Sequence, residues 1–220
     1  MTLTPTTWGY SLWADEPVTL PEMLTLQEFD EYTAGKYAGD QRTAVDIKAA
    51  CASIRNYVGW HLAPVMPCLA LYNRQAGNVK RVGSDLLVQL PARFVPEVMG
   101  VLLNASYDAD SETWSGDETT DFDFETNGIL RIYDACTNGR KSKIAIAYMA
   151  GVPDNMLDAV KELIAHRVTH ALAASYGVQT ETAGGVSITY SANWINSARA
   201  TALADDNKEI LMPYRLQGVF

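Results

Sequence analysis

The spacing of hydrophobic residues changes twice along this 220-residue chain, and the change constrains the fold more than any single motif does. Between residues 40 and 60 the apolar side chains recur at the spacing of an amphipathic helix, and the same spacing returns over 154–176. Within 143–149 the apolar residues instead alternate in two sets: Ile144, Ile146 and Tyr148, and Ala145, Ala147 and Met149. Such alternation predicts a strand, so β structure should lie between helices.

Cap and turn signals place the remaining elements. Thr25 and Glu28 have the spacing of a capping box, which predicts a short helix from that point. Turn dipeptides such as Asn127-Gly128 separate short runs of β-type residues. The candidate strands before 143–149 are 67–73, 86–90, 98–107, 121–125 and 129–133.

This order of elements predicts an α+β fold: a helical bundle with an inserted small antiparallel β-domain, a β-hairpin and an extended C-terminal tail. The expected parts are an extended N-terminal arm (1–24), a helical domain (25–62 and 151–212) that carries the hairpin 178–190, the β-insert (63–150) and the tail 213–220.

The charge balance bears on which partners the protein can bind. The chain has 26 acidic and 17 basic side chains, a net charge of −9, which argues against a protein that clamps nucleic acid. The basic cluster Arg140-Lys141-Ser142-Lys143 is short and follows a turn, so we interpret it as a solvated loop. The acidic segment 108–121 around Trp114 is interpreted in the same way, because it lacks the EF-hand pattern that calcium binding would favour.

The cysteines and the N-terminus indicate where the chain is made. Cys51, Cys68 and Cys136 are odd in number and well separated, which is typical of a protein of a reducing cytoplasm and not of a disulfide framework. The first residues have neither a basic region nor an apolar run, so no signal peptide is expected. No apolar stretch approaches the roughly 20 residues that cross a bilayer, so no membrane partner is expected.

One group of side chains could carry chemistry. Glu162, His166 and His170 are spaced four residues apart, so all three should lie along one face of the 154–176 helix, where they could bind zinc. The pattern is not HExxH and supplies no general base, so a hydrogen-bonded boundary or a subunit contact is the favoured interpretation. We therefore expect no catalytic residues, no metal and no cofactor, with a metal-dependent hydrolase using these three residues as the alternative.

Both ends of the chain carry apolar residues where polar ones would be expected. Near the N-terminus these are Trp8, Tyr10 and Trp13, which either pack on their own domain or contact a neighbouring subunit. Near the C-terminus the residues that follow Pro213 form a candidate docking element: Tyr214, Arg215, Leu216, Val219 and Phe220.

Three segments resemble the head-tail connector (adaptor) family of siphophages and gene-transfer particles. The pair LTLQEFDEY and the 40–60 helix ending NYVGWHL is similar to the opening helices of that family. The segment VPDNMLDAVKELIAHRVTHALAASYG is similar to its central helix, with His166 at the position of the family's histidine. The third segment is GGVSITY followed by EILMPYRLQG, which is similar to its hairpin and terminal helix.

The resemblance implies a structural protein of the virion neck, made in the host bacterial cytoplasm, without an active site. It implies a homo-oligomeric ring, usually twelve-fold, that binds the portal protein, extends the DNA channel without specific DNA binding, and carries the next neck or tail protein, such as a stopper or tail terminator. His166 and His170, with the N-terminal aromatic residues, would then contact neighbouring subunits. A further alternative is another phage neck or tail-completion protein.

Overall fold

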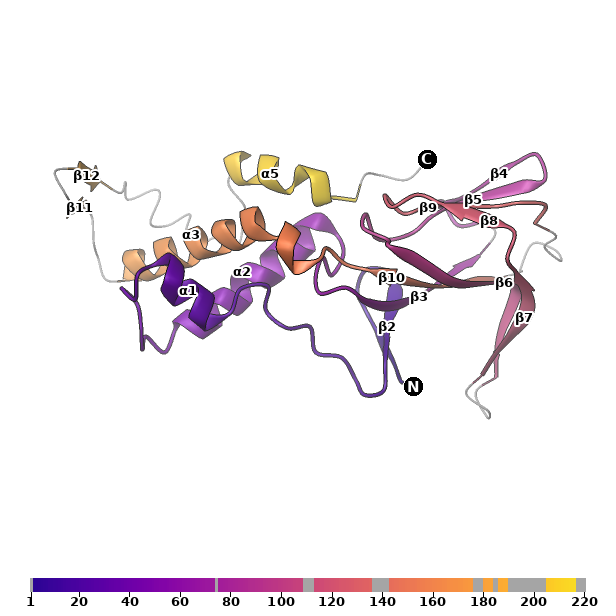
Figure 1. Ribbon diagram of the computed structural model, residues 1–220, viewed down its shortest axis with the longest axis horizontal. Coiled ribbons are helices and arrows are strands. Elements are labelled where there is room, and N and C mark those ends of the chain that lie inside the picture. The colour runs from indigo at the N-terminus through magenta and orange to yellow at the C-terminus, as the bar shows by residue number, and fades with distance from the viewer. Residues whose placement is uncertain are drawn as a thin grey trace. The chain divides into compact units, whose positions relative to one another are not determined.

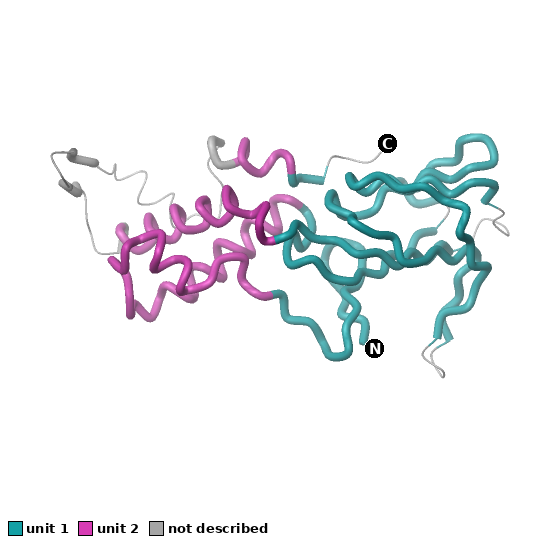
Figure 2. Tube along the Cα trace, in the orientation of Figure 1, with its two compact units in different colours: residues 1–20, 59–153, 214–220 teal, residues 21–58, 154–213 magenta. Residues whose placement is uncertain are grey.

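We describe the protein from a computed structural model, shown in Figure 1, over residues 2–73, 75–108, 113–135, 143–175, 180–183, 186–189 and 205–216. The chain divides into two compact units, each assembled from separate stretches of sequence (Figure 2). Unit 1 comprises residues 1–20, 59–153 and 214–220, and unit 2 comprises residues 21–58 and 154–213.

Unit 1 is built from two antiparallel sheets. The first has six strands in the order β1 (Thr2–Pro5), β2 (Tyr10–Ala14), β3 (Met66–Asn73), β10 (Lys143–Ala150), β6 (Glu97–Asp108) and β7 (Thr113–Thr119). The second has four strands in the order β4 (Val79–Val82), β5 (Asp85–Gln89), β9 (Ile129–Ile132) and β8 (Phe122–Phe124).

The two sheets of unit 1 enclose its core. Tyr72 of β3 donates a hydrogen bond through its hydroxyl to the carbonyl of Gln89 on β5, at 3.1 Å, which joins one sheet to the other. Both inner faces are fully buried; they are formed by Cys68, Ala70, Val101, Ile144, Ile146 and Tyr148 on the larger sheet and by Leu86, Val88, Leu130 and Ile132 on the smaller one. Burial of such apolar surface is the main force that holds the sheets together.

Unit 2 contains helices α1 (Leu26–Tyr32), α2 (Thr43–Val58), α3 (Asp158–Ser175) and α5 (Asp205–Leu211), with 3-10 turns η1 (Asp154–Met156) and η2 (Met212–Tyr214), the last residue of which belongs to unit 1. Helix α3 contacts α1, α2 and α5. Its apolar face is buried with the facing residues of α1 and α2: Phe29, Ile47, Ile54, Val160, Ile164, Val168 and Leu172. Strands β11 (Thr180–Ala183) and β12 (Val186–Thr189) pair as the predicted antiparallel hairpin.

The predicted fold class is wrong. The protein is mostly β, with sheets of six and four strands, and not a helical bundle with a small inserted β-domain. The strands predicted from alternation are present as β3, β5, β6, β8, β9 and β10. Four further strands were not predicted: β1, β2, β4 and β7. They make the β structure larger than the small inserted domain that was expected.

Two segments interpreted as irregular pair with the six-stranded sheet instead. Residues 1–24 were expected to form an extended arm, yet β1 and β2 form a hairpin within them, and β2 pairs with β3. The acidic segment 108–121 was expected to be a loop, yet Thr113–Thr119 pairs with β6 as β7. The backbones of both segments gain in the sheet the hydrogen bonds that a loop would take from water, and Tyr10 and Leu12 of β2 are also buried.

Gly128 offers a test of the turn that holds the smaller sheet. It lies between β8 and β9 with φ +89, and a Cβ there would stand 2.1 Å from the carbonyl oxygen of Ala92. Gly83 also has positive φ, +64, but a Cβ there would meet nothing within 4 Å. We expect Gly83→Ala to cost about 1–2 kcal/mol from backbone strain alone. Gly128→Ala should cost a further ~1–3 kcal/mol, because the loop must also move. Urea denaturation of both variants measures the difference, and equal losses would contradict it.

Candidate functional site

The outer face of the six-stranded sheet is apolar and hollowed. A cavity of about 840 Å³ opens on it, and its floor comes from side chains that point away from the core: Leu69 on β3, Leu102 on β6, and Ala145 and Ala147 on β10. The small side chains of β10 and Gly100 beside them lower the middle of the sheet surface. We call this cavity the hollow.

A bulge in β6 keeps apolar residues on the hollow side. Leu102 faces the hollow, Asn104 has φ +54, and Ala105 then packs with Leu69 and Ala145 beneath it, where the register with β7 shifts. Gly116 of β7 crosses this bulge so closely that a Cβ there would lie 2.7 Å from the carbonyl oxygen of Leu103. Bulges of this kind re-aim side chains along a strand, and here the bulge extends the apolar surface toward Tyr107.

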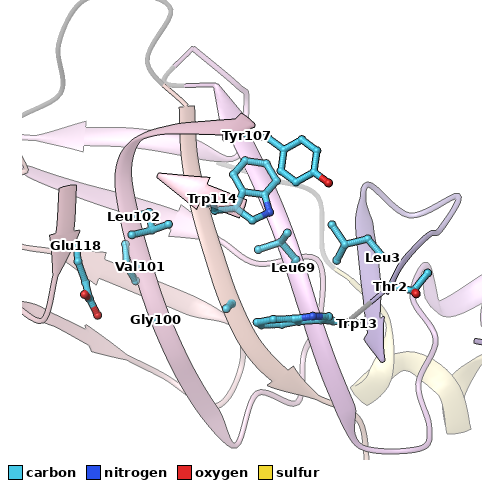
Figure 3. Close-up of a pocket in the computed structure, with 12 residues that line it drawn as sticks. Thr2, Leu3, Trp13, Leu69, Gly100, Val101, Leu102, Tyr107, Trp114 and Glu118 are labelled. Carbon is cyan, nitrogen blue, oxygen red and sulfur yellow. The ribbon is translucent and has the colours of Figure 1, made fainter. Parts of the chain in front are cut away.

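Aromatic side chains border the hollow on two sides (Figure 3). Trp13 of β2 lies beside Leu3 of β1, its partner in the register. Trp114 of β7 lies against Tyr107 of β6, with ring centroids 5.0 Å apart. Tyr107 is 46% exposed, and both tryptophans are half-buried. Open surface of this size and composition is typical of an interaction site.

The outer face of the smaller sheet is different in kind. Arg131 of β9 forms a salt bridge of 2.6 Å with Asp85 of β5 and lies over the ring of Tyr133 at 5.0 Å. The Tyr133 hydroxyl donates to Asp123 of β8 at 2.7 Å. The Arg131 guanidinium lowers the pKa of Asp85. Charged groups on this face satisfy one another, whereas the face with the hollow is apolar.

The predicted N-terminal aromatic residues have separate surroundings. Tyr10 is buried, and its hydroxyl lies 2.7 Å from Nδ1 of His61 and accepts from the His61 backbone N–H. Nε2 of His61 lies 3.0 Å from the carbonyl of Ala150 and must carry the proton, since a carbonyl can only accept. This satisfied network was missed by sequence reasoning. Trp8 stacks on Tyr10, and Trp13 lines the hollow. Both tryptophans are half-buried and keep some accessible surface.

The start of the predicted C-terminal docking element contacts unit 1 itself. The carbonyl of Tyr214 accepts a hydrogen bond of 2.7 Å from Nε1 of the buried Trp60, and the carbonyl of Arg215 accepts from Arg93 at 3.4 Å. A Cβ on Gly59 would stand 3.6 Å from the side chain of Leu216. Val219 and Phe220 lie outside the described residues.

The histidines of α3 lie together as their spacing predicts. Nε2 of His166 and Nε2 of His170 are 2.9 Å apart, so one ring donates to the other. Burial, and then the charge of His166, lowers the pKa of His170 to about 4. Glu162 is exposed, and over the described residues no three His, Cys, Asp or Glu side chains are placed to hold a metal ion.

The remaining candidates are structural or outside the described ranges. Burial raises the pKa of Cys51 and raises that of Cys68 to about 12, so both thiols are neutral and unreactive at physiological pH. Cys136 and three residues of the basic cluster, 140–142, lie outside the part of the chain that is described. Among the described helices none is long and apolar enough to cross a membrane.

In unit 2, the buried cation Lys161 links helix α3 to two carboxylates. Nζ of Lys161 on α3, which is 8% exposed, lies 2.5 Å from Glu28 of α1 and 2.8 Å from Asp154. Glu28 also completes the predicted capping box, since its carboxylate accepts from the backbone of Thr25 at 2.7 Å. The hydrogen bond from Lys161, followed by that from Thr25, lowers the pKa of Glu28 to about 2.

Comparison with known proteins finds likenesses among solved structures, all those described being at low sequence identity. No family model and no curated protein sequence matches the chain. A chain from the neck of an empty GTA particle computed with C6 symmetry is 18% identical, with a TM-score of 0.42, over 88% of this chain and 98% of that one. A chain from the neck of a native GTA particle computed with C12 symmetry is 16% identical, with a TM-score of 0.46, over 94% of this chain and 100% of that one. TM-scores below 0.5 establish neither a shared fold nor a shared function.

The Glu28 carboxylate should make the free energy of unfolding depend on pH in the acidic range. Its folded pKa of about 2 lies below the ordinary 4.5, so its contribution is complete above pH 4.5 and is lost as the pH falls toward 2. Glu28→Gln removes this titration. We expect the free energy of unfolding of wild type to fall toward that of Glu28→Gln between pH 4.5 and 2. A constant gap between the two unfolding curves would contradict the prediction.

The imidazole of His170 should make the free energy of unfolding depend on pH in a higher range. Its folded pKa of about 4 lies below the ordinary 6.5, so the unfolded chain binds its proton first and stability falls as the pH drops from 6.5 to 4. We expect His170→Gln to flatten the pH dependence of the unfolding free energy in this range and to leave the range below pH 4 unchanged. An unchanged slope between pH 4 and 6.5 would show that the imidazole is not held neutral.

Proposed function

We propose that this chain is a structural subunit of the neck of a tailed phage or related particle, a head-to-tail connector that works as one copy in a ring. The observation that carries the proposal is the hollow on unit 1, an apolar surface bordered by Trp13 and Trp114 that a partner protein would cover. The sequence resemblance to connector proteins supplies the kind of assembly. The proposed role includes no catalytic step and no cofactor.

The charge of the chain suits a ring around DNA. Each copy carries a net charge of −9, so a ring of about twelve copies would repel the phosphate backbone of DNA passing through it. A basic wall would bind the DNA and slow its passage. The proposed ring therefore extends the channel of the portal protein without specific DNA binding, and it presents its other side to the next neck or tail protein.

The proposed portal-docking element is the end of the C-terminal tail. Tyr214, Arg215 and Leu216 already contact unit 1, through Trp60, Arg93 and Gly59. The docking role is therefore assigned to residues 217–220, which include Val219 and Phe220. Burial of side chains of this size stabilises a contact by about 1.5–3 kcal/mol each where a partner supplies the surface.

Two truncations test the proposal. Deletion of residues 217–220 should leave the melting temperature unchanged but abolish binding to the portal protein of the same particle, measured by sedimentation and electron microscopy of the mixture. Deletion of residues 214–220 should also lower stability, by about 1–3 kcal/mol, because Nε1 of Trp60 loses its buried acceptor.

Two outcomes would count against the proposal. A full-length chain that stays monomeric with portal protein at high concentration would exclude the connector role. Portal binding that survives the deletion of residues 217–220 would exclude this part of the tail as the dock and leave the connector role standing.

A further inference from the structure

We propose that the hollow of one copy receives strand β4, Val79–Val82, of the neighbouring copy, so that subunits join head to tail. This inference rests on the proposed function, because it names the subunit contact of the ring. The surfaces that meet are different parts of the same chain: the hollow with the adjoining strand β7, and the edge strand β4 of the smaller sheet.

A copy cannot fill its own hollow with β4. The smaller sheet packs on the inner face of the six-stranded sheet, as the hydrogen bond from Tyr72 to Gln89 and the buried side chains between the sheets establish. The hollow opens on the outer face, where Leu69, Leu102 and Ala147 point. Strand β4 and the hollow therefore belong to opposite sides of the larger sheet, and only another copy can bring them together.

Strand β4 has the shape and chemistry of an inserted segment. It is an edge strand, paired with β5 alone, so its other edge is open to a further backbone partner. Val82 is 45% exposed, and Lys80 and Arg81 beside it are exposed as well. Among the described residues these two are the only adjacent pair of basic side chains.

The hollow side supplies the opposite charge. Strand β7 is one of the two edge strands of the larger sheet, and its exposed carboxylates Asp117 and Glu118 are consecutive in sequence. Glu118 lines the hollow, while Asp117 accepts a hydrogen bond of 2.6 Å from Nδ2 of Asn104 that fixes its position. Lys80 and the exposed Val82 share one face of β4 and thus match the apolar hollow with Glu118 at its edge, while Arg81 and Asp117 lie on the opposite faces of their strands.

The lining favours a protein segment over a small polar ligand. Ten of the twelve residues that line the hollow are apolar, aromatic or glycine, and only Thr2 and Glu118 are not. Such a surface offers few polar groups to orient a small molecule. The contact joins two different patches, so the same contact can repeat from each copy to the next. The copies form a closed ring when the rotation between neighbours divides a full turn evenly.

Charge reversal tests the contact. Lys80→Glu with Arg81→Glu makes β4 acidic, and Asp117→Lys with Glu118→Lys makes β7 basic. Each variant alone should raise the protein concentration needed for assembly at least tenfold, measured by sedimentation velocity with portal protein present. An equimolar mixture should assemble again, because acidic β4 meets basic β7 and basic β4 meets acidic β7. Native mass spectrometry should then find equal numbers of the two variants in each ring.

Matched variants control for net charge. Lys36→Glu with Lys48→Glu, and Glu22→Lys with Glu31→Lys, change the charge equally at exposed positions of unit 2 and should leave assembly unchanged. If the β4 and β7 variants assemble like wild type, or if their mixture fails to recover, this contact is wrong while the connector role stands. If wild type itself never assembles, both proposals fail.

Discussion

The structure of unit 1 depends on strand β10, which pairs with β3 on one side and β6 on the other. Its large side chains, Ile144, Ile146 and Tyr148, are fully buried between the sheets and supply much of the core. Its small ones, Ala145 and Ala147, face outward and leave the surface low enough to form the hollow. Because side chains alternate along a strand, one sequence of eight residues contributes to both the core and the candidate site.

Elements with a strong period could be predicted from the sequence. Both faces of β10, the capping box of Thr25 and Glu28, and the helices of unit 2 follow from local patterns. The edge strands β1, β4 and β7 could not be predicted in this way. An edge strand has one neighbour and little buried surface, so sequences such as VKRV and TWSGDET carry no alternation and depend largely on backbone pairing with that neighbour. Together with β2, these omitted strands explain why the fold class was wrong.

The hollow could not have been predicted for a related reason. Its walls come from β1, β2, β3, β6, β7 and β10, which are distant in sequence and meet only through long-range pairing. The sequence marked Trp13 as a candidate contact residue but placed it in an extended arm, and it placed Trp114 in a solvated loop. It also grouped Tyr10 with Trp8 and Trp13, although the hydroxyl of Tyr10 is held inside the core by His61. The aromatic residues indicated that the protein has an interaction surface. The pairing of the β-strands determines which of these residues form that surface.

The charges on the open edges also constrain how copies can meet. Exposed edge strands are prone to pair with one another, and proteins commonly oppose this with charge. Here β4 carries Lys80 and Arg81, and β7 carries Asp117 and Glu118. Pairing of β4 with β4, or of β7 with β7, would bring like charges together, and both symmetric dimers are thereby disfavoured. Pairing of β4 with β7 is the arrangement in which the charges attract. The side chains that keep like edges apart would thus also orient the subunits. Because each contact joins two different edges, the subunits can only follow one another head to tail.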